Sequence, residues 1–171
     1  LFAARGYHDV TIEEIASAVD LTASGVYRHF EGKAAILLEA CARAATHLDE
    51  GMDRAEHRAL TDGPQAAIRA LAADYVAHTD ENHRLMRVYF ADVNSLDDDD
   101  QRRLRALQRE YIGRWTTLLV QARPALSQRE ATILAHAGFN VVADLLTRAH
   151  IRRQPATSQT THVLQVVLGV A

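Results

Sequence analysis

The feature that most constrains this chain is a pair of short helical patterns separated by a tight turn near its start. Residues 11–14, with the sequence TIEE, form a capping box, in which the threonine hydroxyl accepts from the third helical amide while the second glutamate reaches back. Asp20 and Leu21 supply the turn, and Thr22 can cap a second short helix that Gly32 ends. Two such helices joined by three to four residues predict a helix-turn-helix.

The apolar residues of this segment indicate how its two helices pack. Ala16 is small where the helices must approach closely, and we expect the space between them to be filled by Ile15, Val19, Leu21 and Val26. The second helix then presents small or polar groups to solvent at its N-terminal end, the end that enters the major groove in this motif. Hydroxyl groups there can donate to phosphates or base edges, and small residues allow close approach to thymine methyls.

The rest of the chain carries apolar residues at helical spacing and no convincing strand. Three prolines and eight glycines among 171 residues also favour helices over a β-rich fold. The acidic run 97–100 suits a helix start, Pro124 follows a helix end, Ser127 can cap the next helix, and Thr157 or Ser158 opens the last. We therefore predict an all-α fold of eight or nine helices, and residues 1–6 resemble the tail of a helix that is already under way where the sequence opens.

The charge balance argues against nucleic-acid binding by the chain as a whole. The formal net charge is −3, and residues 1–50 hold four Arg or Lys against eight Asp or Glu, a balance of −4. A DNA-binding role must therefore depend on cations at particular points. Lys33, at the start of the third helix, is one such point, because its charge and the free amides of the helix start can hold a phosphate together.

Residues 1–7 (LFAARGY), the pairs Thr11-Ile12 and Ile15-Ala16, and residues 26–33 (VYRHFEGK) closely resemble the signature of the TetR family of transcriptional regulators. The resemblance covers about the first 45 residues. It implies a helix-turn-helix DNA-binding domain, here residues 1–34 with a truncated first helix, and a helical ligand-binding and dimerisation domain over 35–171. The positions that line the DNA face in that family correspond to Thr11, Thr22, Ala23, Ser24, Gly25, Tyr27, Arg28, His29 and Lys33.

Two positions depart from the family pattern. Asp20 stands where the family commonly has glycine, and Asp tolerates the left-handed conformation better than most residues. Ala34 stands where an acidic residue usually follows the lysine. Both departures bear on stability and affinity more than on identity.

The middle helices are rich in large apolar side chains with polar tips, a composition typical of ligand pockets. Plain core packing is the simpler explanation for any one of these residues, and the family resemblance is what favours a pocket, taken as a whole, for a small, largely hydrophobic effector. The candidate ligand-binding residues are Tyr75, His78, Met86, Tyr89, Phe90, Tyr111, Trp115 and Phe139.

The last two helices carry small and aliphatic residues on broad faces, namely Ala135, Gly138, Val142, Leu146, Val163 and Val167. Such faces can be buried within one chain, or can pair with a second copy as in the family. A homodimer through these helices suits a palindromic double-stranded DNA operator. We expect a repressor that its ligand releases from the operator, with activation left open.

Other kinds of site find little support. The single Cys41, in an apolar run, excludes an internal disulfide or Cys-based zinc cluster and suits a buried apolar position, and His78 and His83 lie poorly for a shared metal. We expect no catalytic residues, no metal, no cofactor and no enzyme. No apolar run reaches 18 residues, which predicts no membrane span and a cytoplasmic protein. The alternatives are a helical sensor or interaction module without specific DNA binding and, more remotely, a helical ligand-processing enzyme.

Overall fold

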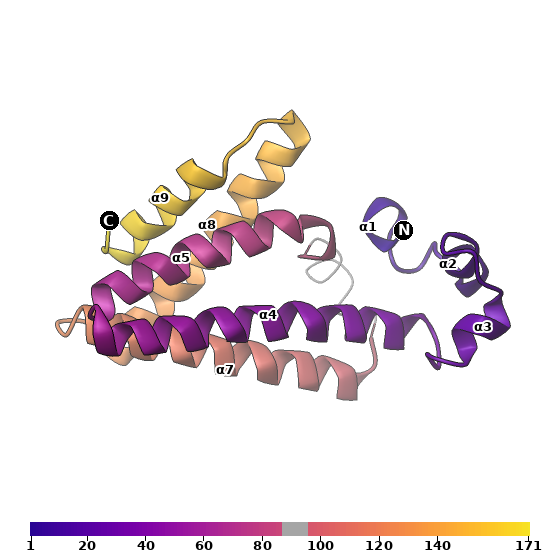
Figure 1. Ribbon diagram of the computed structural model, residues 1–171, viewed down its shortest axis with the longest axis horizontal. Coiled ribbons are helices and arrows are strands. Elements are labelled where there is room, and N and C mark those ends of the chain that lie inside the picture. Colours follow the sequence, from indigo (N-terminus) through magenta and orange to yellow (C-terminus); the bar gives the residue numbers. More distant parts are fainter. Residues whose placement is uncertain (87–95) are drawn as a thin grey trace. The chain divides into compact units, whose positions relative to one another are not determined.

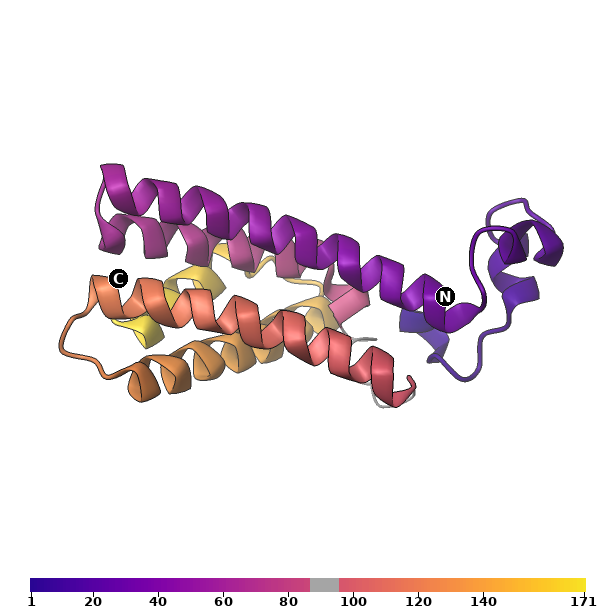
Figure 2. The same ribbon diagram turned by 90° about the horizontal axis from the view of Figure 1, so that it is seen from below.

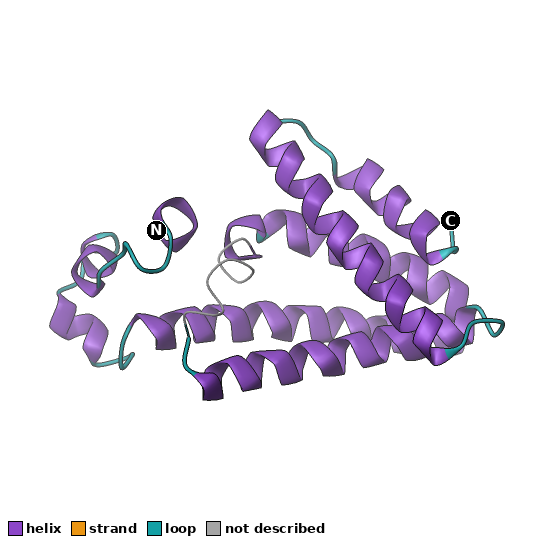
Figure 3. Cartoon of the chain, turned by 180° about the vertical axis from the view of Figure 1, so that it is seen from behind, coloured by secondary structure: helices purple, strands orange, loops and turns teal. Residues whose placement is uncertain are grey.

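The computed structural model describes residues 1–86 and 96–171, and these residues form helices and no strand (Figures 1 and 3). The all-α prediction is therefore confirmed. The predicted ligand-binding residues Tyr89 and Phe90 lie outside the described residues. The helices are α1 (Phe2–Arg5), α2 (Ile12–Ser17), α3 (Ala23–Tyr27), α4 (Lys33–Thr61), α5 (Pro64–Glu81), α7 (Asp98–Ala122), α8 (Gln128–Arg152) and α9 (Thr157–Leu168).

The chain divides into two compact units. Unit 1 comprises Leu1–Ala45 and Arg84–Arg105, and unit 2 comprises Thr46–His83 and Ala106–Ala171. Helices α4 and α7 each contribute residues to both units. These units are defined by contacts within the chain and not by function. The predicted boundary after residue 34, between a DNA-binding and a ligand-binding domain, therefore stays a prediction.

Local chemistry starts and ends the short helices of unit 1. Thr11 Oγ1 accepts from the Glu14 amide at 3.3 Å while the Glu14 carboxylate accepts from the Thr11 amide at 2.9 Å, so the predicted capping box is present. Thr22 Oγ1 accepts from the Gly25 amide at 3.1 Å and caps α3. Asp20 adopts the left-handed conformation, with φ of 56°, in the turn between α2 and α3.

The packing between these two helices differs from the prediction. Ile12, Ala16 and Val26 form a small buried cluster, with Ile15, Phe30 and other residues packed against it. Val19 and Leu21, expected in that space, are 58% and 49% exposed. The reason is that α2 ends at Ser17, so neither residue lies on the inner face of a helix, and Phe30 packs against the cluster from beyond α3.

A second cluster in unit 1 joins the start of α4 to the start of α7. It contains Tyr7, Leu37, Cys41, Leu96 and Leu104. Cys41 is buried there, as its apolar surroundings predicted, and burial raises the pKa of its thiol to about 11. Among the acidic residues of the run 97–100, Asp97 Oδ1 accepts from the Asp100 amide at 2.8 Å at the start of α7.

Unit 2 holds the larger core, nineteen buried residues contributed by α4, α5, α7, α8, α9 and the segment after α9. Helix α5 contacts α8 and α9, and α9 lies along α8 (Figures 1 and 2). Gly138 permits the last contact, because a Cβ there would lie 2.6 Å from Leu164 Cδ1. None of the described helices is both long enough and apolar enough to cross a membrane.

The starts of α8 and α9 both agree with the prediction. Ser127 caps α8 through a complete capping box with Glu130, as predicted. Thr157 is the first residue of α9, as predicted, and no side chain caps this helix. Ala156 occupies the cap position, and the Thr157 hydroxyl donates to Asp80 at 2.5 Å on α5 instead.

Candidate nucleic-acid interface and ligand site

Helix α3 and the residues beside it carry most of the predicted DNA face. The side chains of Thr22, Ser24, Tyr27, Arg28 and His29 are exposed, and Tyr27 exposes 55% of its surface despite its aromatic ring. The hydroxyl oxygens of Thr22 and Ser24 lie 3.0 Å apart, so one of them donates to the other. The surface therefore offers hydroxyl, phenol, imidazole and guanidinium groups within one short segment.

Two of the predicted DNA-binding residues, Gly25 and Ala23, are less exposed to solvent than the sequence suggested. Gly25 is buried rather than on the solvent side, and a Cβ there would lie 3.3 Å from Thr22 Oγ1. Ala23 is half-buried and packs against the small cluster between α2 and α3. In this structure Gly25 therefore gives room to the capping hydroxyl of Thr22.

Thr11 is exposed at the start of α2, where an ion pair links α1 to α2. Arg5 Nη1 lies 2.8 Å from Glu14 Oε1, and Arg5 Nη2 donates to the Asp9 carbonyl at 2.7 Å. The hydrogen bond from Arg5 holds the pKa of the Glu14 carboxyl below its ordinary value, with the Thr11 amide adding to the effect. The Thr11 amide is thus engaged within the chain, and its hydroxyl accepts from Glu14.

The ammonium of Lys33 is turned toward the chain itself. It donates to the carbonyls of Tyr7 at 2.8 Å, His8 at 3.2 Å and Val10 at 3.2 Å, and it lies 4.6 Å from the centre of the Tyr7 ring. An ammonium has three N–H groups, so these carbonyls account for all of them. A phosphate contact by this ammonium would have to replace at least one of these bonds.

Four of the eight predicted ligand-binding residues meet in one aromatic cluster in unit 2. Tyr75 on α5, Tyr111 and Trp115 on α7, and Phe139 on α8 have ring centres separated by 4.7–6.3 Å in the five pairs that touch. Trp115 is fully buried. Three helices that are distant in sequence therefore bring these rings together. These four residues form the aromatic cluster.

The polar tips of this aromatic cluster are buried. The Tyr111 hydroxyl and the Trp115 indole N–H have no hydrogen-bond partner among the described residues. Burial raises the pKa of Tyr75 and of Tyr111 above the ordinary tyrosine value, so both phenols are neutral.

Two further predicted ligand residues, His78 and Met86, are among the described residues. His78 is buried on α5, stacks on His47 of α4 with ring centres 4.5 Å apart, and has its Nδ1 3.2 Å from the Asn82 side-chain nitrogen. Met86 is half-buried and belongs to unit 1, so its place in a ligand site stays a prediction.

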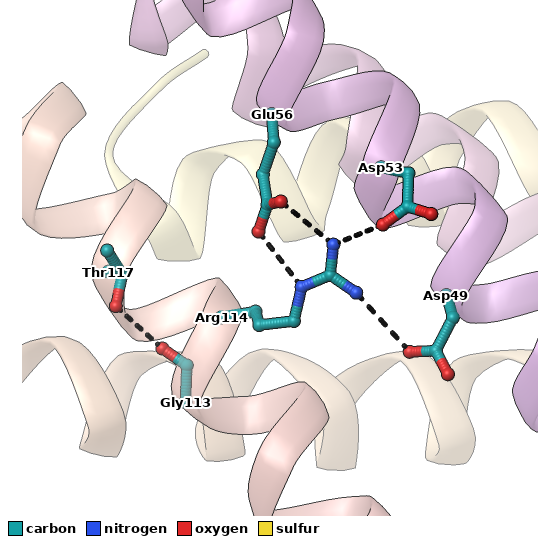
Figure 4. A network of polar contacts seen from close by, with 6 residues as sticks. All are labelled: Asp49, Asp53, Glu56, Gly113, Arg114 and Thr117. Carbon is teal, nitrogen blue, oxygen red and sulfur yellow. Dashed lines mark hydrogen bonds and ion pairs between the residues drawn. The ribbon is translucent and has the colours of Figure 1, made fainter.

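Sequence reasoning missed an ion-pair network around Arg114 (Figure 4). On α7, Arg114 reaches three carboxylates of α4: Glu56 at 2.9 Å, Asp53 at 2.5 Å and Asp49 at 3.6 Å. Bonds to Glu56, ahead of those to Asp53, raise the pKa of Arg114, whereas burial raises that of Asp49. The spacing of the three acidic residues shows that they share a helix face, but nothing local identifies a partner 58 to 65 positions later.

A second polar cluster joins the ends of α5, α8 and α9. His150 Nε2 lies 2.7 Å from Asp80 Oδ1, and the His83 and His150 rings stack with centres 3.5 Å apart. Within the described ranges, no group of three or more His, Cys, Asp or Glu residues is arranged to hold a metal ion.

The structure also separates two sets of apolar residues on the last two helices. Ala135, Gly138, Val142 and Leu146 are buried within the chain. By contrast, Ile133 and Ile151 on α8 and Val166 on α9 are 58%, 76% and 55% exposed. Val163 and Val167, the other two predicted residues, are half-buried on α9.

The chain matches two family models. One, described as "Bacterial regulatory proteins, tetR family", matches residues 1–40, and the other, "Tetracyclin repressor-like, C-terminal domain", matches residues 61–153. Among curated proteins, the HTH-type transcriptional activator FasR of Mycolicibacterium smegmatis is 31% identical over 88 residues. This match covers 50% of the chain and only 40% of the relative's length.

Solved structures share the fold at low sequence identity. The TetR family transcriptional regulator PfmR of Thermus thermophilus superposes with a TM-score of 0.82 at 18% identity, covering 98% of this chain and 92% of that one. AibR in complex with isovaleryl coenzyme A and operator DNA gives a TM-score of 0.70 at 17% identity, covering 96% and 90%.

Proposed function

Because this chain belongs to the TetR family of bacterial regulatory proteins, we propose that it is a ligand-responsive, DNA-binding transcription regulator. The observation that carries the proposal is α3, a capped helix whose exposed residues offer hydroxyl, phenol and guanidinium groups together. The start of α3 would read base edges, with Thr22, Ser24 and His29 in reach of the major groove. Tyr27 and Arg28 would contact phosphates.

Lys33 has a different part in this proposal. Its three bonds to the carbonyls of residues 7, 8 and 10 support a positioning role, in which the ammonium fixes the segment between α1 and α2 against the start of α4. The phosphate contacts then fall mainly to Tyr27 and Arg28. This assignment suits the acidic balance of the first 50 residues, because few cations remain for the backbone of DNA.

We would first select fragments of the source genome bound by the protein at about 0.1–0.15 M salt, since affinity depends steeply on salt. We expect a palindromic site to be enriched and expect Arg28→Ala to reduce the slope of log affinity against log salt by about 1. Arg43→Ala is the matched control, because it also removes one exposed cation, one that pairs with Glu39 on α4. A folded protein that enriches no sequence would support the helical sensor or interaction module instead.

The homodimer is proposed to form through the exposed apolar residues of α8 and α9. Ile133, Ile151 and Val166 are the side chains that a partner would cover. Replacing Val166 with Glu should shift the protein toward the monomer in analytical ultracentrifugation. Leu60→Glu is the control, because Leu60 is 87% exposed and belongs to α4 rather than to either of these helices. Equal behaviour of the two variants would place the interface elsewhere.

The effector is proposed to bind at the aromatic cluster and to release the protein from its operator. Support comes from the rings of Tyr75, Tyr111, Trp115 and Phe139, and from AibR, a protein of the same fold whose structure contains isovaleryl coenzyme A and operator DNA. The direction is tested by transcription from the selected site with and without the protein. Stimulation would make it an activator, as FasR is described.

A further inference from the structure

The Tyr111 hydroxyl and the Trp115 indole together leave one hydrogen-bond donor of the aromatic cluster without an acceptor. An indole N–H only donates, whereas a phenol donates once and also accepts. These two neighbouring groups therefore hold two protons and one accepting oxygen, and neither has a hydrogen-bond partner among the described residues. Even if Trp115 donates to the phenol oxygen, the hydroxyl proton still needs an acceptor. Buried donors are normally paired, so the mismatch points to an acceptor supplied from outside.

The surroundings of this donor are apolar. The rings of Tyr75 and Phe139 pack against Trp115, and both phenols are neutral. A molecule that reaches Tyr111 must therefore bring a largely hydrophobic body with it. The hydrogen-bond acceptor of that molecule would face the donors of Tyr111 and Trp115, which are both uncharged. Neither side chain could therefore neutralise a charge on the ligand.

The charged groups that act on the Tyr111 hydroxyl disfavour an anionic ligand. Asp49 and Arg114 both act on the Tyr111 hydroxyl. The guanidinium of Arg114 is already engaged by Asp49, Asp53 and Glu56, so three carboxylates stand against one cation. A carboxylate beside Tyr111 would be repelled by this network and would lose its strong hydration, whereas a neutral oxygen carries no charge to be repelled and costs much less to dehydrate.

We propose that the effector presents a neutral carbonyl oxygen, as in an acyl ester, thioester, amide or ketone, to the donors of Tyr111 and Trp115, with its hydrocarbon body among the aromatic rings. This inference rests on the ligand site of the proposed function and names the chemistry that the site selects. It separates a neutral acyl derivative from the corresponding free fatty acid, which is ionised at neutral pH.

The test uses three probes with the same chain length: 2-decanone, decanoate and decane. Trp115 is the single tryptophan, so its fluorescence reports on the site directly. We expect 2-decanone to bind roughly tenfold more tightly than decane, because decane leaves the donor unpaired, and expect decanoate to bind more weakly than the ketone. Equal binding of ketone and decane, tighter binding of decanoate, or no response to any probe would overturn the proposal.

Tyr111→Phe removes the hydroxyl and keeps the ring and the fluorophore. It should reduce the preference for 2-decanone over decane severalfold while changing decane binding little. Tyr7→Phe, in unit 1, is the matched control and should keep the full preference. Binding of the selected DNA fragment by the same preparations is measured in parallel. Retained DNA binding without the carbonyl preference would reject this inference alone, whereas loss of sequence-specific DNA binding would reject the proposed function.

Discussion

The helix-turn-helix of unit 1 and the helical core of unit 2 are held together in different ways. The buried cluster between α2 and α3 contains Ile12, Ala16 and Val26. The conformation of this region is otherwise stabilised by capping hydroxyls, by one residue in the left-handed conformation and by the hydrogen bonds of Lys33. Unit 2 buries nineteen residues from five helices and the segment after α9. The difference shows that one chain can depend on local hydrogen bonds in one region and on long-range packing in another.

The largest effect should follow from a cavity in the core of unit 2. Leu119 is fully buried, and Leu119→Ala should reduce the free energy of unfolding by about 2–5 kcal/mol through lost burial and an unfilled cavity. Denaturant unfolding followed by Trp115 fluorescence measures it. Leu60→Ala is the control, because Leu60 is 87% exposed and should change stability by less than about 0.5 kcal/mol. Similar losses in both variants would show that packing does not dominate unit 2.

The same contrast explains what the sequence could predict. The caps by Thr11, Thr22 and Ser127 were predictable because donor and acceptor lie three residues apart, and all three are present. The inward positions of Val19 and Leu21 were wrong because they depended on α2 continuing past Ser17, and the end of so short a helix is not set by apolar spacing.

Long-range features were less accessible from the sequence. Tyr75, Tyr111, Trp115 and Phe139 were selected for their composition, but their meeting depends on the packing of α5, α7 and α8. The network of Arg114 joins residues on two helices, and no local rule pairs them.

The next largest effect should come from the positioning role of Lys33. Lys33→Met keeps the aliphatic stem and removes three bonds to carbonyls, so we expect a loss of about 1–3 kcal/mol from the stability of unit 1. Hydrogen exchange should quicken in residues 7–16, while the salt dependence of DNA binding keeps its slope. Arg43→Met, which breaks an exposed pair with Glu39, should change neither. A slope reduced by about 1 at unchanged stability would assign Lys33 to a phosphate.

A smaller effect is expected at the cap of α3. Thr22→Ala leaves the Gly25 amide without its acceptor and should cost about 1 kcal/mol, whereas Thr22→Ser should retain most of the stability. Amide exchange of Gly25 measures it locally. Thr117→Ala in unit 2 is a suitable control, since that exposed hydroxyl only donates back to the Gly113 carbonyl within α7 (Figure 4). Equal responses would contradict the greater dependence of unit 1 on local bonds.

The turn between α2 and α3 should respond in the opposite direction. Asp20 has a φ of 56°, which glycine adopts without the Cβ penalty, so Asp20→Gly should stabilise unit 1 by about 0.5 kcal/mol after the entropy of the unfolded chain is counted. Asp20→Val should destabilise it, since a β-branched residue is strained there. Thermal unfolding with exchange of the α2 amides compares the three proteins. A stabilising valine would show that the turn relaxes out of this conformation.

The smallest effect is expected at the capping box, a motif that occurs in both units. Glu14 and Glu130 each complete a capping box, and hydrogen bonds lower the pKa of both carboxyls, from Arg5 foremost for Glu14 and from Ser127 for Glu130. A lowered folded-state pKa contributes stability above the unfolded-state value of about 4.3, and this stability is lost as the pH falls through the folded-state pKa.

Carboxyl chemical shifts followed by NMR should therefore titrate below the ordinary glutamate range at both positions. Arg5→Gln should move the pKa of Glu14 upward and leave that of Glu130 unchanged, because only Glu14 has an ion pair across two helices of its unit. If Arg5→Gln left both pKa values unchanged, the hydrogen bonds of the Thr11 and Ser127 caps would be enough to lower the pKa of the glutamate in each unit. The two regions would then differ in their packing and no longer in their capping chemistry.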